Sequence, residues 1–128
     1  MKAILDTHAF LWWLLADERL SAISRSMIEQ PENDILVSAI TGYEIASKAT
    51  RGRLVLPGSP SAFVGSRVSS EGFAPLAVSL EHAVRAGILP DIHRDPFDRI
   101  LIAQAQVEGL PILTADPLIA QYDVETIW

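Results

Sequence analysis

Short apolar segments alternate with helix-like segments along the whole chain, and this alternation restricts the possible folds more than any other feature. β-Branched and other apolar residues gather in the short segments, as they do in buried strands. Strands that alternate with helices usually form one mainly parallel sheet, so the sequence predicts an α/β fold. The expected strands are Lys2–Leu5, Ile35–Val37, Phe73–Val78, Pro111–Leu113 and Val124–Ile127.

Polar caps and glycines mark the ends of the expected helices. Ser38 caps a helix that runs to about Arg51. Asp95 caps a longer helix over Pro96–Glu108, which Gly109 ends. The other expected helices are Thr7–Leu15, Ser21–Gln30, Ser61–Ser70, Ser79–Ala86 before Gly87, and a short one from Asp116-Pro117 to Gln121.

The segment from Phe10 to Leu15 is apolar on every side of a helix. Because such a helix is usually buried more fully than an amphipathic one, we expect it to lie in the core. The alternative is that part of it forms a groove for a partner helix or a surface for a second copy of the chain.

Length and composition predict one compact domain over residues 1–128. Hydrophobic residues make up 49% of the chain, which is enough to bury a core. The sequence contains no cysteine, which excludes disulfides, zinc–thiolate sites and cysteine nucleophiles. The longest apolar run, Ala9–Ala16, is too short for a membrane helix, and the first residues do not resemble a signal peptide. We therefore expect a soluble, cytoplasmic protein.

The net charge of −6 argues against a nucleic-acid-binding surface, because such surfaces are usually basic. A nuclease whose site consists of carboxylates is an exception, since its acids hold a metal ion and the ion meets the phosphate. A partner protein can also supply the missing basic charge.

Four acidic residues fall where the expected strands and helices meet. Asp6 ends the first strand, and Glu44 lies early in the helix after the second strand. Asp98 lies in the first turn of the long helix, and Asp116 follows the strand that contains Ile112-Leu113. In open α/β sheets, ligands bind beyond the carboxyl ends of the strands. We therefore expect these acids to meet at one edge of the sheet.

Converging carboxylates repel one another and raise each other's pKa unless a cation lies between them. Oxygen ligands favour hard ions such as Mg²⁺ or Mn²⁺. Such an ion can orient a phosphodiester, activate water and stabilise the leaving oxygen. This is the physical case for phosphodiester hydrolysis.

Each acid also has a purely structural interpretation. Asp6 and Asp116 can cap helices, and so can the segment that starts at Asp95. Glu44 can form an exposed i,i+4 ion pair with Lys48. Spacing alone leaves the structural and functional interpretations equally supported.

Four motifs add the specific information that spacing lacks. They resemble, in the same order, the motifs of VapC-type PIN-domain proteins, which are the ribonuclease toxins of bacterial toxin–antitoxin pairs. Tyr43 stands where this family often has tryptophan, which keeps the aromatic bulk. In chain order the motifs are Leu5-Asp6-Thr7-His8-Ala9-Phe10-Leu11-Trp12, Val37-Ser38-Ala39-Ile40 with Tyr43-Glu44-Ile45-Ala46 and Lys48, His93-Arg94-Asp95-Pro96-Phe97-Asp98-Arg99 with Ile102-Ala103-Gln104-Ala105, and Leu113-Thr114-Ala115-Asp116.

The resemblance implies a three-layer α/β/α fold with a central, mainly parallel sheet, and metal-dependent endonucleolytic cleavage of RNA. It also implies a homodimer, a cognate VapB-like antitoxin, and Mg²⁺ or Mn²⁺ as the cofactor. The implied metal site consists of Asp6, Glu44, Asp98 and Asp116, with Thr7, Asp95 and Thr114 in support.

Five basic residues are candidate contacts for RNA phosphates. Their structural alternatives are favourable charge at a helix C-terminus and ion pairs with nearby acids. For His8 and His93 we expect solvent exposure or helix capping, with a position at the edge of the site as the alternative, and neither is required as a metal ligand. The five basic residues are Lys48, Arg51, Arg53, Arg94 and Arg99.

Two other functions compete with a ribonuclease. The same carboxylates would serve a metal-dependent phosphatase or a DNA nuclease, although no Asp-x-Asp pair follows the first strand, which counts against an aspartyl-phosphate mechanism. The chain would otherwise be a binding module that acts through an antitoxin in a DNA-bound repressor complex.

Overall fold

A five-stranded, entirely parallel sheet forms the centre of the computed structural model, which describes residues 1–128. The strands lie in the order β3-β2-β1-β4-β5. Ala3 pairs with Ile35 on one side of β1, and Leu5 pairs with Leu113 on the other. The strands are β1 (Lys2–Leu5), β2 (Asp34–Ser38), β3 (Ala74–Leu76), β4 (Ile112–Leu113) and β5 (Thr126–Ile127).

The helices cover both faces of this sheet because successive strand residues point to opposite sides. Ala3 and Leu5 pack in one apolar cluster with Phe10, whereas Ile4, between them, packs in a second cluster with Leu101. The three-layer α/β/α arrangement is therefore confirmed. The helices are α1 (Thr7–Leu14), α2 (Ala22–Glu29), α3 (Ala39–Thr50), α4 (Pro60–Ser70), α5 (Leu80–Ile88) and α6 (Pro96–Glu108), with a 3₁₀ turn, η1 (Ile119–Gln121).

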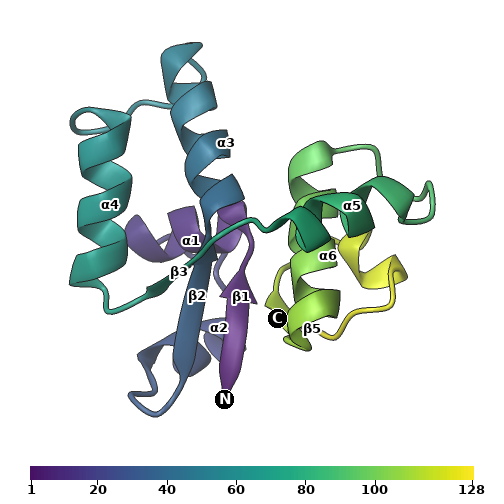
Figure 1. The fold of residues 1–128 in the computed structure, drawn as a ribbon. Coiled ribbons are helices and arrows are strands. Elements are labelled where there is room, and N and C mark those ends of the chain that lie inside the picture. Colours follow the sequence, from purple (N-terminus) through teal and green to yellow (C-terminus); the bar gives the residue numbers. More distant parts are fainter.

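Figure 1 shows α3 and α4 side by side on one side of the molecule, and α5 against α6 on the other. The chain runs outward from β1 to β2 and β3, and then returns to β4 on the opposite side of β1. The strand order thus reverses between β1 and β4. The carboxyl ends of strands at such a reversal border the crevice where α/β proteins bind their ligands.

Several elements differ from the sequence prediction. Helix α5 continues through Gly87 and ends at Ile88. The next residue, Leu89, precedes Pro90, and proline disfavours helical geometry in the residue before it. Strand β3 is shorter than expected, and its Pro75 is tolerated because β3 is an edge strand of the sheet. No helix has the length and apolar character needed to cross a membrane.

The prediction that α1 is buried on all sides is wrong. Phe10 is fully buried, but the residues from Leu11 to Leu14 are only half-buried, and Leu15 is 66% exposed. Ala9 and Phe10 pack in the core with Ala3 and Leu5, whereas Leu11, Leu14 and Leu15 lie beside the segment Leu54–Leu56 without being fully covered. An apolar surface therefore remains open next to the end of α1.

Candidate active site

Asp6 lies at the reversal between β1 and β4 and has two structural partners. It caps α1, with Oδ1 accepting a hydrogen bond from the Ala9 backbone N–H at 2.7 Å. Its Oδ2 accepts a hydrogen bond from the Thr114 hydroxyl, just beyond β4, at 2.5 Å. Burial raises the pKa of Asp6, and the two hydrogen bonds and nearby His8 oppose that shift, while the charge of Asp116 adds to it. Asp6 can therefore cap α1 and also belong to the charged site.

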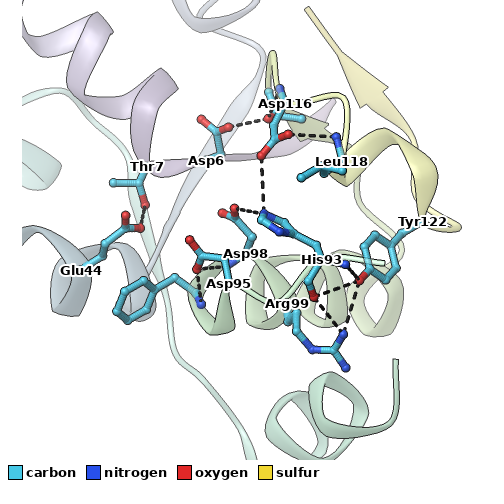
Figure 2. A network of polar contacts seen from close by, with 12 residues as sticks. Asp6, Thr7, Glu44, His93, Asp95, Asp98, Arg99, Asp116, Leu118 and Tyr122 are labelled. Carbon is cyan, nitrogen blue, oxygen red and sulfur yellow. Dashed lines mark hydrogen bonds and ion pairs between the residues drawn. The ribbon is translucent and has the colours of Figure 1, made fainter. Parts of the chain in front are cut away.

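Asp98 and Asp116 converge on the imidazole of His93 (Figure 2). The Nε2 of His93 lies 2.8 Å from Oδ2 of Asp98 and 3.7 Å from Oδ2 of Asp116. One ligand atom from each residue lies within 4.8 Å of the other two. The remaining Asp116 oxygen, Oδ1, accepts a hydrogen bond from the Leu118 backbone N–H at 2.9 Å. Asp116 therefore caps the turn with one oxygen and presents the other to the site.

Asp98 carries a raised pKa of about 6. Burial is the main cause, and the charge of Asp95 and, more weakly, that of Asp6 add to it, whereas His93 opposes the shift. Asp95 itself caps α6, since its Oδ1 accepts from the Phe97 N–H at 2.8 Å and from the Asp98 N–H at 3.3 Å. The predicted capping by Asp95 is therefore confirmed, and its support of a metal site stays a prediction.

Glu44 does not belong to the group formed by His93, Asp98 and Asp116. Its Oε1 accepts a hydrogen bond from the Thr7 hydroxyl at 2.7 Å, and its Oε2 pairs with Lys48 Nζ at 2.5 Å. Figure 2 shows the Glu44 carboxylate turned toward Thr7 and away from His93. The i,i+4 pair with Lys48 thus exists, but Glu44 is 5% exposed and not on the surface as that interpretation assumed.

His93 corrects the sequence analysis, which expected exposure or capping for this residue. Its side chain is only 16% exposed and lies between two of the predicted site acids. The available signal was its place in the third motif: Pro96 starts α6 soon after His93, so the preceding turn can fold the imidazole back onto Asp98. His8, by contrast, is exposed as expected.

Arg99 holds the segment that carries His93. Its guanidinium donates to backbone carbonyls of residues 86, 89, 90 and 93, at 2.8 to 3.2 Å. The buried Tyr122 hydroxyl accepts from the His93 backbone N–H at 2.8 Å and donates to the Pro90 carbonyl at 2.9 Å. Because these bonds occupy Arg99, we withdraw it as a candidate RNA contact. It also does not pair with nearby acids, which was the structural alternative.

The other basic candidates have different surroundings. Lys48 is tied to Glu44, whereas Arg51, Arg53 and Arg94 are exposed and form no ion pair. The exposed arginines retain free donors for an anionic ligand. The structure therefore leaves three of the five basic residues available for RNA phosphates.

The donor set of the site fits a hard divalent cation. The carboxyls of Asp6 and Asp98 have raised pKa values, chiefly because of burial, and no lysine or arginine forms an ion pair with Asp6, Asp98 or Asp116. A divalent ion would remove this shortage of positive charge, and carboxylate oxygens suit Mg²⁺ or Mn²⁺. Asp98 and Asp116 would hold such an ion with Asp6 beside them. Glu44 would join only by giving up its bond to Lys48.

The chain belongs to the PIN-domain family, whose model matches residues 3–125. Among curated proteins it is similar to Ribonuclease VapC22 of Mycobacterium tuberculosis, with 28% identity over 114 residues, or 88% of this chain and 85% of that protein. Among solved structures, VapBC2 of Rickettsia felis bound to a promoter DNA fragment matches with a TM-score of 0.73 and 12% identity over 99% of this chain and 98% of that one. FitAcB of Neisseria gonorrhoeae matches with a TM-score of 0.68 and 21% identity over 98% and 96%.

Proposed function

We propose that this protein is a metal-dependent endoribonuclease that uses Mg²⁺ or Mn²⁺. The observation that carries the proposal is that Asp98 and Asp116 meet beside His93 at the strand-order reversal, with the buried Asp6 near enough for its charge to raise the pKa of Asp98. The similarity to a protein named as a ribonuclease supports RNA as the substrate.

A divalent ion bound there would supply a Lewis acid that orients the phosphodiester, acidifies a water molecule and stabilises the leaving oxygen. The protein's part is to keep the carboxylates in place. Thr114 fixes Asp6, and His93 fixes Asp98. Attack of water on phosphorus breaks the bond to the 3′ oxygen and leaves a 5′-phosphate, with no covalent enzyme intermediate.

Glu44 is the fourth proposed carboxylate, and Thr7 is its support. The Thr7 hydroxyl keeps Glu44 beside the strand end that bears Asp6. Exposed Arg51, Arg53 and Arg94 are proposed to bind phosphates of the RNA strand away from the cleaved bond, where they provide local positive charge on a chain whose net charge is −6.

A comparison of substrates tests this function against the phosphatase and DNA nuclease alternatives. The purified protein would be incubated with RNA, with DNA of the same sequence and with a small phosphate monoester, each with Mg²⁺ or Mn²⁺. We expect cleavage of RNA alone, at internal sites, with 5′-phosphate ends on the products. Hydrolysis of the monoester or equal cutting of DNA would overturn the proposal.

We also propose that the protein is the toxin of a toxin–antitoxin pair and is covered by a small VapB-like partner. An apolar groove of about 120 Å³ lies between the end of α1, the segment Leu54–Leu56 and α4. Leu15 and Val55 at this groove are 66% and 94% exposed. Neighbouring exposed apolar side chains of this kind are typical of a surface that binds a partner. The similar solved structures include a VapBC complex bound to promoter DNA, which favours a role in a repressor complex as a second function.

Co-expression with the product of the neighbouring gene tests the partner. We expect a stable complex in which RNA cleavage is inhibited, and we expect Leu15→Glu or Val55→Glu to weaken it without loss of folding. Light scattering of the free protein would test the proposed homodimer in the same preparation. A complex that forms equally well with both glutamate variants would place the partner elsewhere.

A further inference from the structure

A pocket that contains two of the proposed site carboxyls also contains side chains that the proposed chemistry does not use. This pocket, of about 340 Å³, is lined by Asp6 and Asp116 together with His8, Trp12 and Arg19. Its volume is in the range of small-molecule sites. A group that fills it would lie directly beside the bond that the carboxylates act upon.

Flat π-systems form the outer wall of this pocket. The His8 and Trp12 rings lie 5.6 Å apart at their centroids, with an angle of 33° between their planes. The Arg19 guanidinium lies 4.9 Å from the centre of the Trp12 ring. Trp12 is also supported from the side by Trp128, at 5.7 Å. Three planar groups thus line one side of a pocket whose other side is acidic.

Arg19 is held in this position before any ligand arrives. Its Nε and one terminal nitrogen donate to the two oxygens of Asp17, at 3.1 and 2.7 Å. The ion pair occupies the edge of the guanidinium and leaves Arg19 a planar face. Asp6 and Asp116, which also line the pocket, disfavour a second phosphate. Of the base, the sugar and the phosphate of a nucleotide, the pocket therefore suits the base, because bases stack on aromatic and guanidinium planes.

We propose that the pocket formed by His8, Trp12 and Arg19 binds the nucleobase next to the cleaved phosphodiester, a proposal that rests on the ribonuclease function above. Stacking of this kind accepts any base, since every base has a π-face. The pocket would hold the RNA strand in register for cleavage, with at most a modest preference for base identity.

Abasic substrates test this proposal. A short RNA that contains one mapped cleavage site would be prepared intact and with the base removed on either side of the cleaved bond. For the wild-type protein we expect kcat/KM to fall roughly tenfold for one of the two abasic RNAs, as loss of one stacked base predicts. His8→Ala and Arg19→Ala should lose a similar factor on intact RNA and almost nothing further on that abasic RNA.

Arg85→Ala is the matched control, because the exposed Arg85 donates to Gln106 Oε1 at 3.4 Å and does not line this pocket. Its cleavage of all three RNAs should equal that of the wild-type protein. If His8→Ala and Arg19→Ala lose the same factor on intact and abasic RNA, or lose nothing on either, the proposed base pocket is wrong.

Tryptophan fluorescence gives a measurement that does not depend on cleavage. In a background with Asp98→Asn, which keeps the RNA intact, and Trp128→Phe, which removes the tryptophan 5.7 Å from Trp12, binding of the oligonucleotide should quench the emission. Trp12→Phe should abolish the quenching and Trp13→Phe should preserve it, because Trp13 faces Glu71 and Phe73 instead. Quenching that survives in Trp12→Phe overturns the base pocket. A wild-type protein that cuts no RNA overturns the ribonuclease proposal instead, and the fluorescence then decides the pocket alone.

Discussion

Asp98 illustrates how a single buried carboxyl links stability to pH. Its pKa is raised from 3.8 to about 6, so the folded protein holds its proton more tightly than the unfolded chain does. The folded state therefore loses stability as pH rises from about 4 to about 6. We predict that Asp98→Asn is more stable than the wild type at pH 7.5 in EDTA, and that the difference vanishes near pH 4.

Thermal unfolding at the two pH values measures this effect, and Asp123→Asn, at an exposed position, serves as the control. If Asp98→Asn destabilises the metal-free protein equally at both pH values, the carboxyl is not the desolvated group that we describe. The same variant should have lost RNA cleavage, which separates stability from activity at one position.

Arg99 stabilises the fold through the planar geometry of its guanidinium group. Its donors join four carbonyls of the segment from residues 86 to 93, and a lysine has no planar fork to replace them. We predict that Arg99→Lys lowers the free energy of unfolding by about 1–3 kcal/mol, as expected for lost charge-assisted hydrogen bonds. Denaturant titration tests this, and a change below about 0.5 kcal/mol would mean that the segment holds itself without Arg99.

The contrast between Asp6 and His93 shows what sequence can predict at this scale. The position of Asp6 follows from local rules. It lies directly between an apolar strand and the helix that it caps, so its carboxyl is fixed at the end of that strand. The position of His93 depends on hydrogen bonds to Arg99 and Tyr122. Tyr122 is far from His93 in the sequence, and no local motif predicts that Arg99 binds the backbone of His93. Long-range hydrogen bonds of this kind leave no periodic pattern in the sequence.

Two glycines allow a matched test of how the helices end. Gly109 ends α6 with φ of 67°, in the left-handed region, whereas Gly87 lies inside α5, and a Cβ at either position meets no atom within 4 Å. We predict that Gly109→Ala destabilises the protein by about 1–2 kcal/mol because of backbone strain. Gly87→Ala should stabilise it by about 0.5–1 kcal/mol through helix propensity.

Chemical denaturation of both variants provides the measurement, and the opposite signs are the essential result. Loss of stability in both would mean that α5 needs its glycine for a reason other than backbone freedom. A gain in both would mean that α6 can end without a left-handed residue.

Caps and strand order explain how much of the elements could be predicted. Ser38 and Asp95 are caps in the structure as in the sequence analysis, since capping is a local hydrogen-bonding rule. The predicted end of α5 at Ala86 is wrong, because Gly87 is tolerated inside the helix and Pro90 sets its end. The burial of α1 was overstated, since an apolar sequence does not reveal which of its faces finds a partner.

At the scale of the whole molecule, metal binding should be visible as stability. A ligand that binds only the folded state adds about 2.7 kcal/mol when its concentration is 100 times Kd. We predict that Mn²⁺ or Mg²⁺ raises the Tm by several degrees at pH 7.5 and much less at pH 5, where the pKa of Asp98 leaves that carboxyl mostly protonated. Asp98→Asn should lose the response. An equal shift at both pH values would point to binding elsewhere.

The net charge of −6 argues against a nucleic-acid function, but the positions of the charges on the fold are compatible with one. A cation bound as proposed would partly neutralise the acids at the site, and Arg51, Arg53 and Arg94 are exposed and form no ion pair. A partner with basic charge would complement the remaining acidic surface. Overall charge is therefore a weaker guide than the place of each charge on the fold.

The most direct measurement is cleavage of total cellular RNA by the purified, partner-free protein. Reactions would contain Mg²⁺ or Mn²⁺, or EDTA, and would compare the wild type with Asp6→Asn and with the exposed control Asp123→Asn. We predict cutting at discrete sites that requires the metal, is lost in Asp6→Asn and is unchanged in the control. Cleavage that continues in EDTA, or at the wild-type rate in a well-folded Asp6→Asn protein, would contradict the assignment of the carboxylates as a metal-dependent ribonuclease site.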